Sequence, residues 1–217
     1  MTILIIDKNN FTYSKFRKTL IDYLVKSNLK VNVAYSDTLF LNNDKSINKL
    51  IDISKMNLLV FFKYLYQLFI LIKVKKPNVI HCFTIKPIIS ILILNIYFKK
   101  KIFLTFTGLG HIFINSSGLI YFLIKLFLKI FIKKEYIIFF QNIHDLDLFV
   151  RNKIVKKEQC KLVPGSGFDK EDIILTNNKV TKKKNFINIL MIARFIKEKG
   201  IVEFVEASIK INKYHKN

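Results

Sequence analysis

The stretch NVIHCFTIKPIISILILNIYFKKKIFLTF, residues 78–106, decides the fold of this chain. Two short apolar runs rich in β-branched and aromatic residues, 78–83 and 102–106, flank a longer apolar stretch at 87–97. Short runs of this kind are typical of strands, and the longer one is typical of a helix. Because buried parallel strands carry near-continuous apolar sequence, the stretch predicts a βαβ unit in a parallel sheet.

The same alternation continues on both sides of this unit. Further strands are predicted at 2–6, 31–35, 136–140 and 161–163, and helices at 14–26, 57–74, 118–133 and 144–155. The order of elements predicts an α/β fold with a Rossmann-like, doubly wound parallel sheet over residues 1–176.

A second, partial domain is predicted at the carboxyl end. Residues 177–185 read NNKVTKKKN and form a charged linker. A strand at 186–192 and a helix from 201 to about 211 predict the first βα unit of another Rossmann-like domain, 186–217. One strand and one helix cannot bury both faces of a sheet, so we expect that domain to be incomplete in this chain.

Composition bounds the classes of function. The chain has 217 residues, is 51% apolar and carries 37 Lys and Arg against 15 Asp and Glu. The apolar content excludes a disordered basic tail. Lys, Ile, Asn and Phe are abundant and Arg is rare, which is typical of a genome rich in A and T, so we attribute most of the +22 charge to background. The Lys are spread over all elements without a nucleic-acid-binding module, which disfavours a specific nucleic-acid partner.

Cysteine use and hydropathy favour a reduced, cytoplasmic chain. Cys82 and Cys160 are too far apart in sequence to suggest a disulfide framework or a metal site. The longest stretch without charged residues, 102–124, is interrupted by Gly, Asn and Ser, so no spanning helix is predicted.

Glycine is scarce and clustered. None occurs in residues 1–107, which excludes the glycine-rich dinucleotide fingerprint. Five of the six glycines follow predicted strands, in FTGLGH (106–111), VPGSGFD (163–169) and ARFIKEKG (193–200). Single glycines are common in turns, but three clusters at strand ends favour a ligand cleft.

The third cluster has the clearest chemistry. Arg194 follows the predicted strand, and Lys199 and Gly200 precede the helix, so two cations and a helix amino end suit a diphosphate. A solvated basic turn is the alternative interpretation for Lys199.

Other candidates lie near the same cleft or on one helix. Tyr13, Phe16, Arg17 and Lys86 are predicted on its acceptor side, although Lys86 can equally be a surface residue. On the helix 118–133, Lys125, Lys129 and Lys133 form one stripe beside apolar surface. This stripe predicts contact with a membrane surface, with a core helix and snorkelling lysines as the alternative.

Six segments together resemble one family. They are FTYSKFRKTLIDYL (11–24), KKPNVIHCFTIKP (75–87), TFTGLGHIF (105–113), FFQNIHDLDLF (139–149), LVPGSGFD (162–169) and ILMIARFIKEKGIVEFVEA (189–207). In this order they resemble the amino-terminal half of a family 4 glycosyltransferase of the GT-B fold, of the bacterial type that acts on polyprenyl-diphosphate-linked sugars.

The resemblance implies two Rossmann-like domains that face each other across a cleft. The first binds a lipid-linked or cell-surface polysaccharide acceptor, and the second binds a nucleotide sugar, expected to be UDP-linked. It implies retaining transfer without a metal or other cofactor, at the inner face of the cytoplasmic membrane.

The resemblance also assigns roles to residues. Arg194 and Lys199, with Gly200, match the positions that contact the donor diphosphate. The turn at Thr107 and Gly108 faces the reacting groups. Many relatives have His at the position of Thr107, and in this chain His111 lies four residues further on. The family's paired carboxylates fall beyond Asn217, so we expect no transfer by this chain alone. A non-catalytic acceptor- or membrane-binding remnant and a GT-B sugar-nucleotide epimerase remain alternatives.

Overall fold

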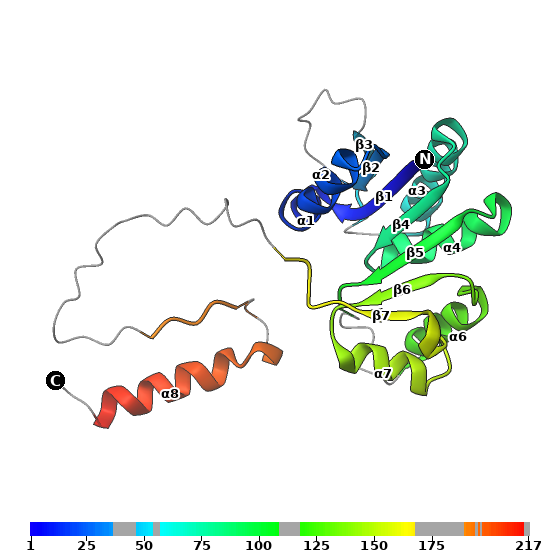
Figure 1. Cartoon of the computed structure of the whole chain (residues 1–217). Coiled ribbons are helices and arrows are strands. Elements are labelled where there is room, and N and C mark those ends of the chain that lie inside the picture. Colours follow the sequence, from blue (N-terminus) through cyan, green and yellow to red (C-terminus); the bar gives the residue numbers. More distant parts are fainter. Residues whose placement is uncertain are drawn as a thin grey trace. The chain divides into compact units, whose positions relative to one another are not determined.

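Seven parallel strands form one sheet in the computed structural model, in the order β3-β2-β1-β4-β5-β6-β7 (Figure 1). The strands are β1 (Thr2–Asn9), β2 (Lys30–Ser36), β3 (Ile47–Leu50), β4 (Val79–Phe83), β5 (Lys101–Phe106), β6 (Ile137–Phe140) and β7 (Cys160–Leu162). The structure describes residues 1–36, 47–53, 57–108, 118–167, 189–193, 195 and 197–214. The strand order reverses between β1 and β4, which is where open α/β sheets bind ligands beyond the carboxyl ends of their strands.

The chain divides into two compact units, Met1–Ile173, which holds the sheet, and Ile174–Asn217. The helices of the first unit are α1 (Asn10–Phe16), α2 (Lys18–Lys26), α3 (Leu58–Lys75), α4 (Ile85–Phe98), α6 (Leu119–Phe131) and α7 (Ile143–Arg151), with a short 3-10 helix η1 (Lys157–Gln159). The second unit contains η3 (Lys197–Lys199) and α8 (Ile201–Tyr214).

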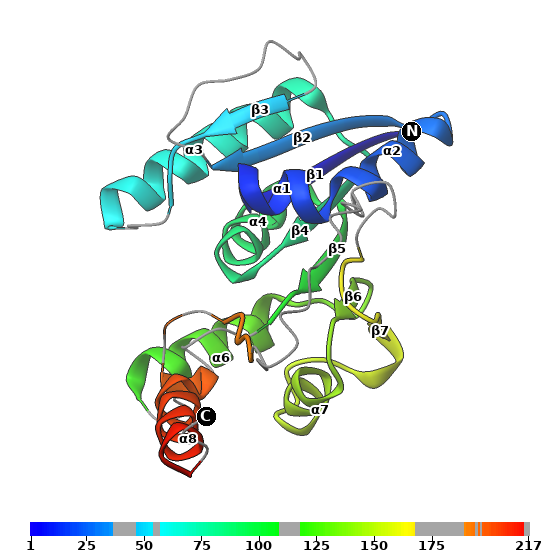
Figure 2. The same ribbon diagram turned by 90° about the vertical axis from the view of Figure 1, so that its left-hand side faces the viewer.

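Helices cover both faces of the sheet (Figure 2), and alternate residues of the central strands pack toward opposite faces. On β1, Leu4 and Ile6 belong to the large core with α3, α4, α6 and α7, whereas Ile3 and Ile5 pack toward α2 through Ile21. This period of two follows from the pleat of the strand. The fold is therefore the doubly wound α/β sheet predicted from the sequence.

Two elements of the sheet unit differ from the prediction. The strand β3 was not predicted, because its four residues INKL contain two polar side chains and lie at the sheet edge. The predicted helix 14–26 is two helices, α1 and α2, separated at Arg17, whose φ of −122° interrupts the helical path. The break turns the Arg17 side chain toward β1, as described below.

In the second unit the predicted helix forms as α8, but the described part of the predicted strand does not. Residues 189–193 have no strand structure, and Leu190 and Ile192 are exposed. A strand needs a neighbour for its N–H and C=O groups, and the described residues of this unit contain no other strand. Residues 186–188 and the predicted linker 177–185 lie outside the described residues.

Candidate functional site

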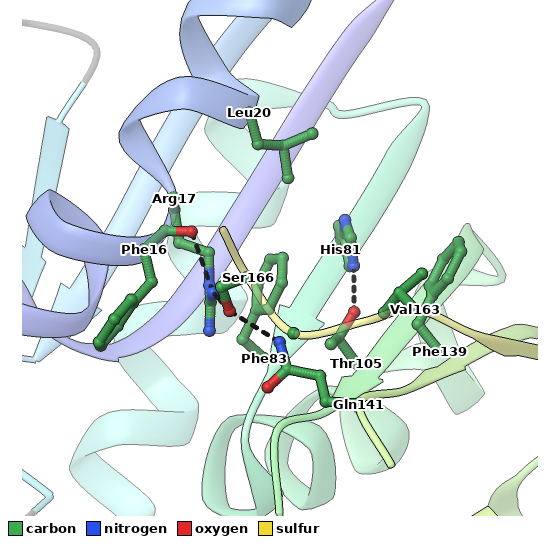
Figure 3. Close-up of a pocket in the computed structure, with 11 residues that line it drawn as sticks. Phe16, Arg17, Leu20, His81, Phe83, Thr105, Phe139, Gln141, Val163 and Ser166 are labelled. Carbon is green, nitrogen blue, oxygen red and sulfur yellow. Dashed lines mark hydrogen bonds between the residues drawn. The ribbon is translucent and has the colours of Figure 1, made fainter. Parts of the chain in front are cut away.

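Two adjoining pockets lie at the carboxyl edge of the sheet, with volumes of about 280 and 490 Å³. They share Phe16, Arg17, Gln141, Gly165 and Ser166. The smaller pocket is completed by Leu20, His81, Phe83, Thr105, Phe139 and Val163 (Figure 3), and the larger by Thr12, Thr84, Thr107, Pro164 and Gly167. The pockets thus combine an aromatic side with a side rich in hydroxyl groups.

A buried ion pair anchors the site. Asp7 and Arg17 are 0% and 3% exposed, and Arg17 Nε donates to Asp7 Oδ2 at 2.9 Å. Burial raises the pKa of the Asp7 carboxyl, and the Arg17 guanidinium opposes this rise, as do hydrogen bonds from Lys8 N and Thr12 Oγ1. Because a buried charge without a partner is costly, each member of this pair holds the other in place.

The local sequence explains why Arg17 reaches Asp7. The Asn9 side chain caps α1 by accepting a hydrogen bond from Thr12 N, and Thr12 Oγ1 lies 3.4 Å from Asn9 N. The capped seven-residue helix ends at Arg17, where the chain leaves the helical path before α2 begins. The Asn-x-x-Thr pattern and the helix break together place Arg17 over the end of β1.

Arg17 also connects α1 to the segment that follows β7. Its Nη1 donates to Ser166 Oγ at 2.7 Å, and its guanidinium lies 4.1 Å from the ring centre of Phe83. Gln141 Nε2 donates to the same Ser166 oxygen at 2.7 Å (Figure 3). Both acceptor positions of the Ser166 hydroxyl are then occupied, which leaves its proton for an oxygen atom of a ligand.

Ser166 owes its position to its neighbours. Gly165 and Gly167 have φ values of +81° and +70°, in the left-handed region that favours glycine. The two glycines therefore form a tight turn that presents the Ser166 hydroxyl to Arg17 and Gln141.

His81 and Thr105 form a second polar pair, inside the aromatic pocket. His81 Nε2 lies 2.8 Å from Thr105 Oγ1, and the imidazole stacks near Phe83, with ring centres 4.2 Å apart. Burial and the nearby positive charge of Arg17 lower the pKa of His81 to about 3. The imidazole is therefore neutral at physiological pH and is a hydrogen-bonding group rather than a charged one.

Thr84 has a strained backbone at the start of α4. Its φ and ψ are +66° and +157°, a region occupied almost only by glycine. Its hydroxyl oxygen is buried and has no hydrogen-bond partner among the described residues. Because Thr84 lines the larger pocket, a ligand there can supply the missing partner.

The structure brings some predicted residues together and leaves others elsewhere. Phe16 and Arg17 line both pockets, and Thr107 lines the larger one, followed by Gly108 with a φ of +137°. His111 lies outside the described residues. Of the site residues predicted on the first unit, Phe16, Arg17 and Thr107 therefore line the pockets at this edge of the sheet.

Tyr13 and Lys86 line neither pocket. Tyr13 stacks on Tyr35, with ring centres 5.3 Å apart, and belongs to the core beneath α1 and α2. Lys86 Nζ donates to the Ile53 carbonyl oxygen at 2.6 Å. Both residues carry structural contacts beside the site.

Of the predicted donor-phosphate residues, Arg194 lies outside the described residues. Lys199 ends η3 and is exposed, and Gly200 precedes α8 with a φ of +71°. On α6, Lys125 Nζ donates to Asn152 Oδ1 at 2.6 Å, whereas Lys129 is exposed. Lys133 is also exposed but lies beyond the helix, which ends at Phe131, so the predicted three-lysine stripe is not on one helix. The lysine stripe is thus divided between an internal contact and the surface.

Sequence reasoning missed Asp7, Thr84, Gln141 and Ser166. Asp7 is the first polar residue after the apolar run of β1, which was a usable signal. Gln141 and Ser166 fall inside quoted segments but were not singled out. Thr84 gave no signal, because a positive φ cannot be read from a threonine.

No family model matches the chain, and no curated protein shows significant sequence similarity to it. Solved structures share its fold. UDP-GlcNAc 2-epimerase from Methanocaldococcus jannaschii is 15% identical, with a TM-score of 0.53 over 75% of this chain and 45% of the epimerase. Sucrose-phosphate synthase from Thermosynechococcus elongatus is 12% identical, with a TM-score of 0.54 over 76% of this chain and 48% of the synthase.

MurG from Acinetobacter baumannii is 8% identical, with a TM-score of 0.51 over 79% of this chain and 47% of MurG. At these identities the likeness defines the fold alone. The chain has the Rossmann-like sheet of GT-B proteins, and it spans about half the length of these solved proteins.

Proposed function

We propose that this chain is the acceptor-binding half of a GT-B glycosyltransferase. In this proposal the complete reaction transfers a sugar from a UDP-linked donor to a lipid-linked or cell-surface polysaccharide acceptor, with retention and without a metal. The observation that supports it is the pair of adjoining pockets, which place hydroxyl and amide groups beside aromatic rings at the carboxyl edge of the sheet.

The electrostatics of the pockets favour a sugar over a free phosphate. The charge of Arg17 is balanced by Asp7, and its Nε and Nη1 already donate to Asp7 and Ser166. Apart from Arg17 Nη2, the groups left for a ligand are neutral, namely the Ser166 proton and the hydroxyls of Thr84 and Thr107. Neutral donors and acceptors beside aromatic rings suit a polyhydroxylated ring.

The remaining roles follow the resemblance and are part of the proposal. Arg194 and Lys199 hold the donor diphosphate, and backbone N–H groups at Thr107 and Gly108 stabilise charge that develops on the departing phosphate. Protein cations and dipoles would then stabilise the negative charge that a metal ion stabilises in other transferases.

A sugar-nucleotide epimerase is the second candidate, because two of the similar solved structures are such enzymes and a third is described as one. That chemistry needs acid and base groups in the cleft. Among the described residues that line the pockets, the ionisable ones are Arg17 and His81. Arg17 is paired with Asp7, and a pKa of about 3 makes His81 a weak base, so these residues favour transfer.

Ligand-observed NMR on the full chain tests the proposal with two probes, farnesyl-diphosphate-linked N-acetylglucosamine and UDP-N-acetylglucosamine. We expect the lipid-linked sugar to bind, and the double variant Ser166→Ala/Gln141→Ala to weaken binding about thirtyfold, because each of the two lost hydrogen bonds contributes about 1 kcal/mol. The matched variant Ser27→Ala/Gln67→Ala changes exposed residues outside the pockets and should bind as the wild type does.

Equal binding by the wild type and the pocket variant would contradict the proposal. If the pocket variant weakens only the binding of UDP-N-acetylglucosamine, the pocket takes a nucleotide sugar and the epimerase candidate replaces the transferase.

A further inference from the structure

The solvent side of α6 is apolar. Leu128 on its inner side is fully buried, yet its outer side carries large exposed apolar residues at helical spacing: Leu119, Phe122, Leu123, Leu126 and Ile130. Leu119 is 71% exposed and Ile130 is 63% exposed. Lys129 lies on the same outer side, and the exposed Lys133 follows the end of the helix. A helix at the surface of a globular protein normally turns polar residues to solvent, and an exposed apolar face such as this one is typical of a binding surface.

The helix α3 repeats this arrangement. Its inner side carries the buried Tyr64, Leu68 and Ile72. Its outer side carries exposed apolar residues at the same spacing: Leu59, Phe62, Tyr66, Ile70 and Val74. Leu59 is 72% exposed and Tyr66 is 67% exposed, and Lys63 and Lys73 accompany them on this side. Two helices therefore share one unusual pattern.

Both helices belong to the same layer. α3 and α6 each contact α4, which lies on the same face of the sheet and whose Ile88, Ile91 and Leu92 are buried (Figure 2). The apolar outer residues of α3 and α6 thus face away from the sheet on one side of the first unit. We call these ten residues, with Lys63, Lys73, Lys129 and Lys133, the outer helical face.

The positive charge of this side of the molecule indicates which kind of partner the outer helical face suits. Residues 53–134, which contain α3, α4 and α6, have 13 Lys and no Asp or Glu. The composition of the chain does not force this, because α7 covers the same side of the sheet and contains Asp145 and Asp147. A surface with only positive charges repels a second copy of itself and attracts an anionic partner.

We infer that the outer helical face docks on an anionic lipid bilayer, with α3 and α6 in the plane of the headgroups. Their apolar side chains enter the acyl boundary, and the lysines extend to the lipid phosphates. Within the described part of the chain, no helix is both long and apolar enough to span a bilayer, so the geometry is that of a surface contact. This inference does not depend on the proposed function.

Co-sedimentation of the full chain with vesicles tests the inference. The probes are vesicles of phosphatidylcholine alone and of equal parts phosphatidylcholine and phosphatidylglycerol. We expect at least tenfold tighter binding to the anionic vesicles, weakened by salt. The variants Leu123→Gln/Ile130→Gln on α6 and Phe62→Gln/Tyr66→Gln on α3 should each weaken binding more than tenfold, because each removes two inserted apolar groups without changing charge.

The matched control is Tyr23→Gln/Val25→Gln, which removes two exposed apolar residues from α2 on the opposite side of the sheet. It should bind as the wild type does. Exposed positions tolerate these changes, and far-UV circular dichroism checks that each variant is folded. Loss of binding in the Lys129→Gln/Lys133→Gln variant but not in the apolar variants would show adsorption by charge alone and overturn the insertion.

Two further outcomes would also overturn the inference. One is equal loss of binding in the α2 control. The other is an apolar variant that binds vesicles normally but changes a self-association seen by analytical ultracentrifugation, which would assign the face to a second copy of the chain.

Discussion

At the carboxyl edge of the sheet, Asp7 and Arg17 are 0% and 3% exposed, whereas on the outer helical face Leu59 and Leu119 are 72% and 71% exposed. The first region hides charges, and the second exposes apolar side chains. Both depart from the usual distribution of residues, in which buried polar groups and large exposed apolar patches are the informative exceptions. The comparison teaches that the two regions suit different partners, and it underlies our two proposals: a polar ligand at the edge, and an anionic lipid surface at the outer helical face.

The largest expected effect is at the buried ion pair. Arg17→Met leaves the Asp7 carboxylate buried without its cation, so we expect a loss of about 3–5 kcal/mol in the free energy of unfolding. Urea denaturation followed by circular dichroism measures it. The double variant Asp7→Asn/Arg17→Met removes both charges and should recover a large part of the loss. If the losses measured for Asp7→Asn and for Arg17→Met separately simply add in the double variant, the two side chains do not stabilise each other.

The pH dependence of stability gives the next effect. In the folded chain the pKa of His81 is about 3, below its ordinary value, so between about pH 6.5 and 3 the unfolded chain binds the proton more readily. The contribution of His81 therefore lowers stability as the pH falls through this range, by up to about 1.4 kcal/mol per pH unit. Urea denaturation at several pH values should show a shallower decline for His81→Gln.

His144→Gln is the matched control for this prediction, because His144 is exposed on α7. It should leave the acid decline unchanged. An identical decline in the wild type and in His81→Gln would place the protonated imidazole in the folded state and contradict the neutral His81–Thr105 pair.

Thr84→Gly is expected to increase the free energy of unfolding, by less than the losses described above. Thr84→Gly relieves a strained backbone that costs about 1–3 kcal/mol, against about 0.5–1 kcal/mol for the flexibility of glycine in the unfolded chain. We expect a net gain of about 1 kcal/mol in thermal or urea denaturation. Thr107→Gly, in the same pocket but without a positive φ, should destabilise the chain instead. Destabilisation by both variants would show that the Thr84 backbone is not strained.

The smallest expected effect on stability is at the outer helical face. Leu123→Gln exposes a polar group where the structure already exposes an apolar one, so the free energy of unfolding should change by less than about 0.5 kcal/mol. Ile91→Gln, on the buried face of α4, should cost several times more in the same urea titration. A loss at Leu123 as large as that at Ile91 would mean that Leu123 is part of the folded core.

The buried strands could be predicted from sequence because parallel strands covered on both faces leave uninterrupted apolar runs. β3 could not, since a short edge strand pairs on one side only and INKL has no such run. Arg17 was singled out by its position at the first helix, but its partner Asp7 depends on the break between α1 and α2. Such a contact is a product of tertiary structure.

Only the α6 part of the outer helical face could be predicted from the sequence. The lysine stripe on α6 pointed to it, yet periodicity alone could not say which apolar side of α6 faces the sheet, and it gave no reason to separate Lys125 from Lys129. α3 was predicted as the helix 57–74, but its exposed outer side was not, because a helix that is apolar all round is interpreted as a core helix. The packing of both helices on the sheet decides which residues are left outside.

One crossed binding measurement tests the central claim that the two regions are separate binding surfaces. The variants Ser166→Ala/Gln141→Ala and Leu123→Gln/Ile130→Gln are each assayed against soluble farnesyl-diphosphate-linked N-acetylglucosamine and against anionic vesicles without that sugar. The account predicts that the first variant loses the sugar and keeps the vesicles, while the second keeps the sugar and loses the vesicles. Loss of both ligands in either variant, or of neither ligand in both, would contradict it.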